Sequence, residues 1–227
     1  MAEPVVLSWS GGKDSTLALA ALRADSRVEP VALLTTVTAG YDRISIHGVR
    51  RQLLAAQARS IGLPLHEMWL EPNSSNDAYE ASLTAALSEL RRHYPGARRI
   101  AFGDLFLEDV RRYREERVPR AGWEPMFPIW GEQTAALARS FVERGYEARL
   151  VCVDTTLLDA RFAGRSLDAA LLRELPPSVD PCGERGEFHT FVAGGPGFEQ
   201  RVAYDVGDVV MREGRFAYCD LVPKESP

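Results

Sequence analysis

The chain has 227 residues, of which 45% are hydrophobic, so it suits one large domain or a main domain with a smaller companion. A formal net charge of −5 gives no electrostatic reason to expect nucleic acid or an anionic membrane as its partner. The N-terminal residues lack the pattern of a secretory signal, and three widely spaced cysteines indicate neither a disulfide framework nor a structural zinc site. We therefore expect a cytoplasmic protein with reduced thiols.

Short apolar runs alternate along the chain with segments of helical periodicity, which is typical of parallel βαβ units. The predicted strands are Val5–Ser8, Val31–Val37, Leu65–Leu70, Arg99–Asp104 and Ala148–Thr155. The predicted helices between them are Ser15–Ala24, Val49–Ile61, Asp77–His93 and Glu132–Arg144. This order predicts an α/β fold of the Rossmann-like type, with a doubly wound, mostly parallel five-stranded sheet.

The pattern changes after about residue 156. Ser166 can cap a short helix over 167–175, which two prolines end. Strand-like pieces follow at 201–204, 208–212 and 215–221, and Glu213 and Gly214 indicate a turn between the last two. We therefore expect an α/β domain over residues 1–155 and a smaller C-terminal α+β region over 156–227.

The sequence SWSGGKDST, residues 8–16, stands between the first predicted strand and the first predicted helix. A Walker A loop requires G-x-x-x-x-G-K-[ST], and a dinucleotide-binding loop requires G-x-G-x-x-G. Neither pattern is present. The remaining pattern, S-G-G-x-D-S over residues 10–15, suits a different phosphate-binding loop at a helix N-terminus.

The residue types in this loop fit phosphate binding. Its glycines let the backbone approach phosphate oxygens, its serine hydroxyls can donate hydrogen bonds, and its lysine supplies positive charge. An aspartate beside polyphosphate is explained if it caps the helix, holds a cation such as Mg²⁺, or does both. The candidate residues are Ser10, Gly11, Gly12, Lys13, Asp14 and Ser15. The alternative without a ligand is a glycine turn before a capped helix.

A second candidate cluster begins at the end of the fourth predicted strand. Ligands of open α/β sheets bind outside the carboxyl ends of the strands, so we expect Gly103 and Asp104 close to the first loop. Asp104 is a candidate ligand of Mg²⁺ or of the nucleotide. Further along, Arg114 and Arg117 are candidates for phosphate or carboxylate recognition, whereas the adjacent arginines at 111 and 112 are expected on a solvated face.

The third cluster is CGERGEFHT, residues 182–190, which gathers two carboxylates, an imidazole and a thiol. A carboxylate or imidazole near a scissile phosphate can bind magnesium, orient an amine nucleophile or accept its proton. Glu184, Glu187 and His189 are therefore candidates for these roles, although any one of them alone is more often structural.

Together the three clusters resemble the diphthine–ammonia ligase family of N-type ATP pyrophosphatases, and the resemblance runs over nearly the whole chain. The loop SGGKDS resembles the family's pyrophosphate loop, and Gly103-Asp104 followed by Tyr113-Arg114 and Arg117 resembles its second motif. The stretch CGERGEFHT resembles its C-terminal signature, and PMFPIW, residues 125–130, its proline-leucine-tryptophan segment. After the second predicted strand, only His47 matches the family's pattern.

The resemblance implies an ATP-binding domain over 1–155 and a substrate-binding region over 156–227. The catalytic residues that it implies are Lys13, Asp14, Asp104, Glu184, Glu187 and His189. The substrate-binding residues that it implies are His47, Arg114, Arg117, Cys182, Gly183 and Glu184. Nucleotide binding would involve residues 10–15 with Gly103, and Mg²⁺ would be held by Asp14 and Asp104.

The implied reaction begins with ATP and Mg²⁺. A substrate carboxylate is adenylated, pyrophosphate is released, and ammonia then forms an amide while AMP leaves. The expected acceptor is protein-bound diphthine or a related bacterial carboxylate, and a homodimer is left open. Two alternatives remain, a nucleotide sensor without turnover and a tRNA-modifying enzyme with the same loop, for which the chain lacks paired catalytic cysteines.

Overall fold

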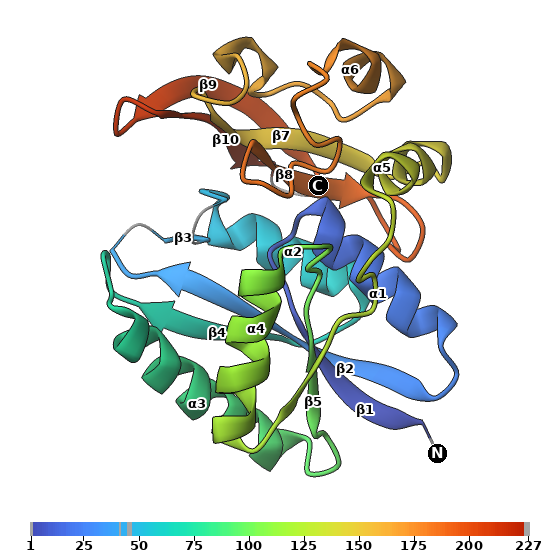
Figure 1. The fold of residues 1–227 in the computed structure, drawn as a ribbon, viewed down its shortest axis with the longest axis vertical. Coiled ribbons are helices and arrows are strands. Elements are labelled where there is room, and N and C mark those ends of the chain that lie inside the picture. The colour runs from blue at the N-terminus through green and yellow to red at the C-terminus, as the bar shows by residue number, and fades with distance from the viewer. Residues whose placement is uncertain (1, 41, 45–46, 225–227) are drawn as a thin grey trace. The chain divides into compact units, whose positions relative to one another are not determined.

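The computed structural model describes residues 2–40, 42–44 and 47–224 (Figure 1). The chain divides into two compact units, each formed by several segments. Unit 1 comprises Met1–Ser10, Asp14–Ser45 and Leu63–Trp130, and unit 2 comprises Gly11–Lys13, Ile46–Gly62 and Gly131–Pro227. Two short segments from the first third of the chain thus belong to unit 2. The domain boundary predicted after residue 155 stays a prediction.

Unit 1 is built on sheet A, in which the strand order is β3-β2-β1-β5-β6 and β4 also pairs with β2. The strands are β1 (Glu3–Ser8), β2 (Val28–Thr38), β3 (Arg43–Ile44), β4 (Leu65–Leu70), β5 (Arg99–Ala101) and β6 (Glu124–Met126). All these pairings are parallel except that of β2 with β3. The predicted α/β fold with a mostly parallel sheet is therefore confirmed.

The helices of unit 1 follow the strands as a βαβ pattern requires. They are α1 (Lys13–Ala24), whose first residue belongs to unit 2, α3 (Asn76–His93), α4 (Glu108–Arg117) and the 3₁₀ helix η1 (Val118–Ala121). The Ser75 hydroxyl caps α3 by accepting the Ala78 N–H at 3.2 Å. Buried leucines of α3 share one core cluster with Val6 of β1 and Ile100 of β5, so this helix is held against sheet A by apolar burial.

Unit 2 contains a second sheet, sheet B, with the order β8-β7-β10-β9. Its strands are β7 (Glu147–Asp154), β8 (Phe188–Gly194), β9 (Tyr204–Arg212) and β10 (Phe216–Pro223), and all their pairings are antiparallel. The helices are α2 (Arg51–Ile61), α5 (Thr134–Glu143), η2 (Ala160–Phe162) and α6 (Ala169–Glu174). The predicted turn between the last two strands is confirmed, because Glu213 and Gly214 have φ angles of 52° and 62° there.

Three local predictions were wrong. The piece predicted as a strand at 201–204 is irregular up to Tyr204, where β9 begins. The segment predicted as the fifth parallel strand, Ala148–Thr155, forms β7 of the antiparallel sheet B, and β6 takes the additional parallel position in sheet A. A mostly buried strand such as β7 is an apolar run in a parallel and in an antiparallel sheet alike, so the sequence does not distinguish the two. The strand β6 has only three residues and contains Pro125, so its sequence pattern does not predict a strand. The cap of α6 is Asp168 rather than Ser166, because the Asp168 carboxylate accepts the Leu171 N–H at 2.8 Å.

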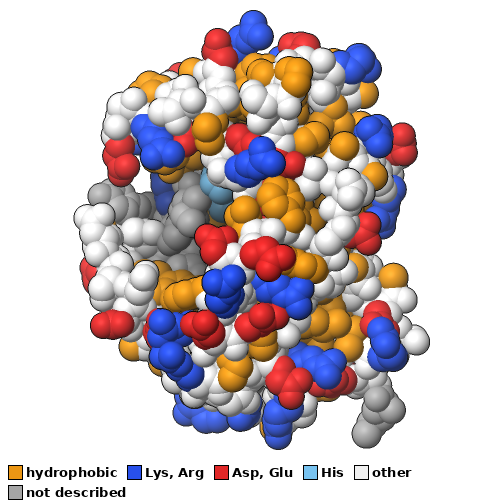
Figure 2. All heavy atoms as spheres, in the orientation of Figure 1, with side chains coloured by type: hydrophobic (Ala, Val, Ile, Leu, Met, Phe, Trp, Pro, Cys, Tyr) orange, Lys and Arg blue, Asp and Glu red, His pale blue; other side chains and the backbone are white. Residues whose placement is uncertain are grey.

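Charges of both signs are mixed on the face that Figure 2 shows, where basic and acidic side chains lie next to one another. Within the described ranges, none of the helices combines the length and the apolar composition that crossing a bilayer requires.

Candidate functional site

The first candidate loop connects β1 to α1, as predicted. Gly11 has a φ of 78°, in the left-handed region that favours glycine. The side chain of Lys13 is only 2% exposed at the start of α1. The hydroxyl oxygens of Ser10 and Ser15 lie 3.3 Å apart, so two potential donors to a phosphate stand together in unit 1.

Gln57 of α2 fixes the backbone at Gly11. Its buried side-chain amide donates to the carbonyl oxygens of Gly11, at 3.0 Å, and of Val192, at 2.5 Å. The Val192 N–H in turn donates to the Gly11 carbonyl at 2.9 Å. Gln57 was not among the residues predicted from the sequence, where a single glutamine in a helix gives no sign that its amide is buried and hydrogen-bonded.

Gly12 lies against residues from two distant parts of unit 2. A Cβ atom at this position would lie 3.0 Å from the Thr190 carbonyl oxygen and 3.1 Å from Cε1 of His47. The N–H of Lys13 donates to the Thr190 hydroxyl at 3.0 Å. The glycine therefore permits a close approach of His47 and Thr190 to the loop, which a larger residue would disturb.

His47 and His189 form an imidazole pair beside this loop. Their ring centroids are 4.7 Å apart, and Nδ1 of His47 lies 3.2 Å from the Thr190 carbonyl oxygen. Because a carbonyl oxygen only accepts hydrogen bonds, Nδ1 of His47 carries the proton and Nε2 keeps its lone pair. Separate roles were predicted for the two histidines, and the structure brings their rings together.

The surroundings of the pair keep both rings neutral. Burial lowers the pKa of His47 to about 4, with a further lowering from the positive charge of Lys13. Burial also holds the pKa of His189 well below its usual value, and the charges of His47 and Lys13 act in the same direction. At neutral pH both imidazoles are therefore uncharged and can accept a hydrogen bond, and the lowered pKa makes each a weaker base than a free imidazole.

Gly103 and Asp104 follow β5 in unit 1, and Gly103 packs against the first loop as predicted. A Cβ on Gly103 would lie 2.8 Å from the backbone carbonyl carbon of Asp14. Both carboxylate oxygens of Asp104 accept hydrogen bonds from Arg114, the shorter at 2.5 Å from Nε. The Arg114 guanidinium also lies 4.0 Å from the ring centroid of Phe102. The structure thus pairs two of the predicted site residues, Asp104 and Arg114.

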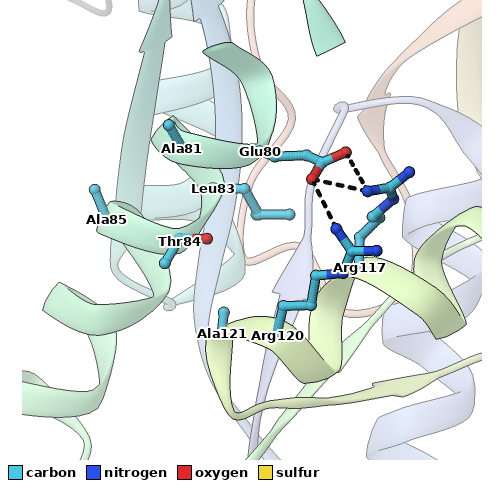
Figure 3. Close-up of a pocket in the computed structure, with 8 residues that line it drawn as sticks. All are labelled: Glu80, Ala81, Leu83, Thr84, Ala85, Arg117, Arg120 and Ala121. Atoms are coloured by element: carbon cyan, nitrogen blue, oxygen red, sulfur yellow. Dashed lines mark hydrogen bonds and ion pairs between the residues drawn. The ribbon is translucent and has the colours of Figure 1, made fainter. Parts of the chain in front are cut away.

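Arg117 has a different environment, at a pocket of about 450 Å³ (Figure 3). Its guanidinium lies 3.2 Å from the Glu80 carboxylate, which also interacts with Arg120 at 3.7 Å. The walls of the pocket are otherwise formed by Ala81, Leu83, Thr84, Ala85 and Ala121. The role of Arg117 in substrate binding stays a prediction, because its partner is Glu80 rather than Asp104.

Two carboxylates organise the C-terminal candidate loop. Glu187 is 2% exposed, and its oxygens accept the N–H groups of Asp180, at 2.8 Å, and Arg185, at 2.9 Å. The Asp180 carboxylate accepts the Cys182 N–H at 2.8 Å and the Thr134 hydroxyl at 2.7 Å. The geometry gives Glu187 a loop-holding role, and its catalytic role stays a prediction. Asp180 was not predicted from the sequence as a residue of this loop's framework.

The other predicted residues of this loop are partly or fully enclosed. Cys182 is buried, and its thiol donates to the Thr134 carbonyl at 3.3 Å. Glu184 is partly buried, and its N–H donates to the Asp180 carboxylate at 3.4 Å. Substrate contacts of Cys182, Gly183 and Glu184 stay predictions. Among the described residues, no group of three His, Cys, Asp or Glu side chains is arranged to hold a metal ion.

Alanine at Gly183 is expected to destabilise the protein more than alanine at Gly186. Both glycines have positive φ, 67° and 85°, so both substitutions introduce backbone strain of roughly 1 kcal/mol. Only at Gly183 would the new Cβ clash, 2.7 Å from the Phe188 carbonyl oxygen, whereas at Gly186 no atom of the described residues, apart from the two adjacent in the chain, lies within 4 Å of it. Urea unfolding should give a loss of at least about 2 kcal/mol for Gly183→Ala. Equal losses for the two variants would contradict this account of the loop.

Both parts of the chain match models of one family. Residues 3–123 match the diphthamide synthase N-terminal domain, and residues 133–219 match the diphthamide synthase C-terminal domain. The chain is 28% identical over 221 residues to a protein from Danio rerio named diphthine--ammonia ligase, covering 89% of this chain and 86% of that protein.

Two further relatives carry the same name. The chain is 25% identical over 225 residues to a protein from Schizosaccharomyces pombe, covering 88% of this chain but only 36% of that protein. It is 31% identical over 111 residues to a protein from Homo sapiens, covering 46% of this chain and 42% of that protein. This chain thus spans little more than a third of the fission yeast relative.

Proposed function

Because the chain belongs to the diphthamide synthase family, we propose that it is an ATP-dependent ligase that joins ammonia to a substrate carboxylate, with protein-bound diphthine as the acceptor. The observation that carries this proposal is the contact between the glycine loop and the imidazole pair. Gly12 lies against His47, and the Lys13 N–H bonds to Thr190, next to His189. These contacts support a site in which the candidate phosphate loop and the neutral imidazole pair act together.

The loop over residues 10–15 would bind the phosphates of ATP. Its backbone leads into the N-terminus of α1, where N–H groups and the helix dipole favour negative charge. Buried Lys13 would stabilise the charge that develops when the acceptor carboxylate attacks the α-phosphate. In this step a bond forms between a carboxylate oxygen and the α-phosphorus, and the bond to the pyrophosphate oxygen breaks.

Mg²⁺ would neutralise phosphate charge when bound, and it usually needs only one or two protein carboxylates beside phosphate oxygens. The donors present fit this requirement. Asp14 stands in the loop itself, next to Lys13. Asp104 already accepts two hydrogen bonds from Arg114, so we assign Asp14 as the main ligand and give Asp104 the further task of positioning Arg114.

The second step would be attack of ammonia on the acyl carbon, with AMP as the leaving group. Ammonium must first lose a proton, since only the free base has the lone pair that attacks. Nε2 of His47 has a free lone pair, because its Nδ1 donates to Thr190, and it would take the proton transiently before passing it to solvent, since the low pKa of His47 disfavours the charged ring. The nitrogen must lose a second proton after it has attacked, and His189, the second neutral imidazole of the pair, would accept it as the amide forms and AMP leaves.

Phosphorus NMR of the purified protein tests the proposal. The sample would contain ATP, Mg²⁺ and ammonium, with and without elongation factor that bears diphthine. We expect AMP and pyrophosphate to appear together and only with the acceptor. Formation of ADP and phosphate would contradict the proposed cleavage at the α-phosphate. Binding of ATP without turnover in the presence of the acceptor would instead favour a nucleotide sensor.

A further inference from the structure

Strand β9 is an edge strand with exposed apolar side chains. It stands last in sheet B and is hydrogen-bonded to β10 (Figure 1). Val206, Val209, Val210 and Met211 are each between 41% and 49% exposed. Natural edge strands are commonly short, bulged or protected by charge, because a free edge can pair with another chain. β9 has a bulge where Gly207 and Asp208 face Asp220, but Val209 to Arg212 pair regularly with β10, so this part of the edge, with its Val-Val-Met run, is suited to pairing.

The charges on β9 are arranged symmetrically about its apolar run. Asp208 precedes Val209-Val210-Met211, and Arg212 follows it. Antiparallel pairing of two such strands with Val210 opposite its own copy would place Asp208 of each strand opposite Arg212 of the other. A shift of the register by one residue separates these charges, and one of the two possible shifts sets Asp208 opposite Glu213. Opposite charges directly across a strand pair are favourable and like charges are unfavourable.

The two charged side chains are available for such a contact. Among the residues that the structure describes, neither Asp208 nor Arg212 forms a side-chain hydrogen bond or an ion pair. Both side chains are exposed. Pairing would give each of them a partner and would shield the neighbouring apolar side chains from water.

We propose that β9 pairs antiparallel with β9 of a second copy of this chain, with Val210 on the two-fold axis. Two four-stranded sheets would then form one sheet of eight strands. A second copy is the partner that fits, because an isologous interface requires a surface complementary to itself, and the Asp208 and Arg212 pattern has this property. The inference does not rest on the proposed ligase activity.

Charge reversal tests the interface and its register. Sedimentation velocity of the wild-type protein is expected to show a dimer. Asp208→Arg gives a strand with arginine at both positions, and Arg212→Asp gives one with aspartate at both, so each variant alone is expected to be monomeric. An equimolar mixture of the two variants should dimerise again, because every aspartate then faces an arginine. The double variant Asp208→Arg/Arg212→Asp should also dimerise.

The control is Arg173→Asp, an exposed charge reversal on α6, which should leave the dimer intact. Circular dichroism would establish that each variant is folded. A monomeric wild-type protein over the micromolar to submillimolar range would overturn the proposal. Single variants that remain dimeric, or a mixture that stays monomeric, would also overturn it, because the charges would then not face each other.

Discussion

Replacing Lys13 with methionine is expected to lower the rate of AMP formation by roughly 100- to 1000-fold, as removal of a charge-stabilising group from a preorganised site does. The side chain is buried at the start of α1, with Nζ 5.6 Å from the ring centroid of Phe188. In this enclosed site its charge is weakly screened. Methionine keeps a similar length and fills the same space, so the loss would come from the missing charge rather than from a cavity.

The sequence offers a matched control for this substitution. Lys13 and Lys224 are the only lysines of the chain. Lys224 is exposed and lies 2.7 Å from the Asp205 carboxylate, so Lys224→Met should leave AMP formation unchanged. The assay is initial-rate detection of AMP in the presence of the diphthine-bearing acceptor. A Lys13→Met variant that is folded and fully active would remove this lysine from the proposed chemistry.

The first loop and most of sheet A could be predicted because their signals are local. A glycine pair between an apolar run and a helical segment indicates the position of the turn. The strands β1, β2, β4 and β5 each lie in an apolar run of the sequence. The short parallel strand β6 has no comparable signal. Its three residues are held by pairing with β5, which is a tertiary effect.

The site within unit 2 depends on contacts between distant residues, which periodicity does not reveal. His47 and His189 are 142 positions apart in the sequence, yet their rings lie side by side. The segment after Gly186 continues as β8, a strand that was not predicted from the sequence, and its pairing with β7 holds His189 and Thr190. Burial and two backbone hydrogen bonds make Glu187 part of the loop's own framework, a role that no local pattern predicts, and its action on a ligand stays a prediction.

Replacing His47 with glutamine is expected to slow amide formation from ammonium by roughly 100-fold or more at neutral pH, as loss of a general base does. The glutamine amide can still donate a hydrogen bond toward the Thr190 carbonyl, so the local structure should be retained. Because the pKa of His47 is lowered to about 4, the wild-type imidazole is already neutral at pH 7 and needs no prior deprotonation. Pyrophosphate release in the first turnover should be unaffected, since it precedes the attack of ammonia.

Hydroxylamine separates proton transfer from a structural role of His47. It is a weaker base than ammonia and is mostly unprotonated at neutral pH, so its attack on the acyl-adenylate does not require a protein base. We therefore expect His47→Gln to form hydroxamate at nearly the wild-type rate while amide formation stays slow. His66→Gln, which alters a histidine paired with Tyr94 in unit 1, should leave both rates unchanged. If His47→Gln slowed both nucleophiles equally, His47 would position the acyl group or the loop rather than accept the proton.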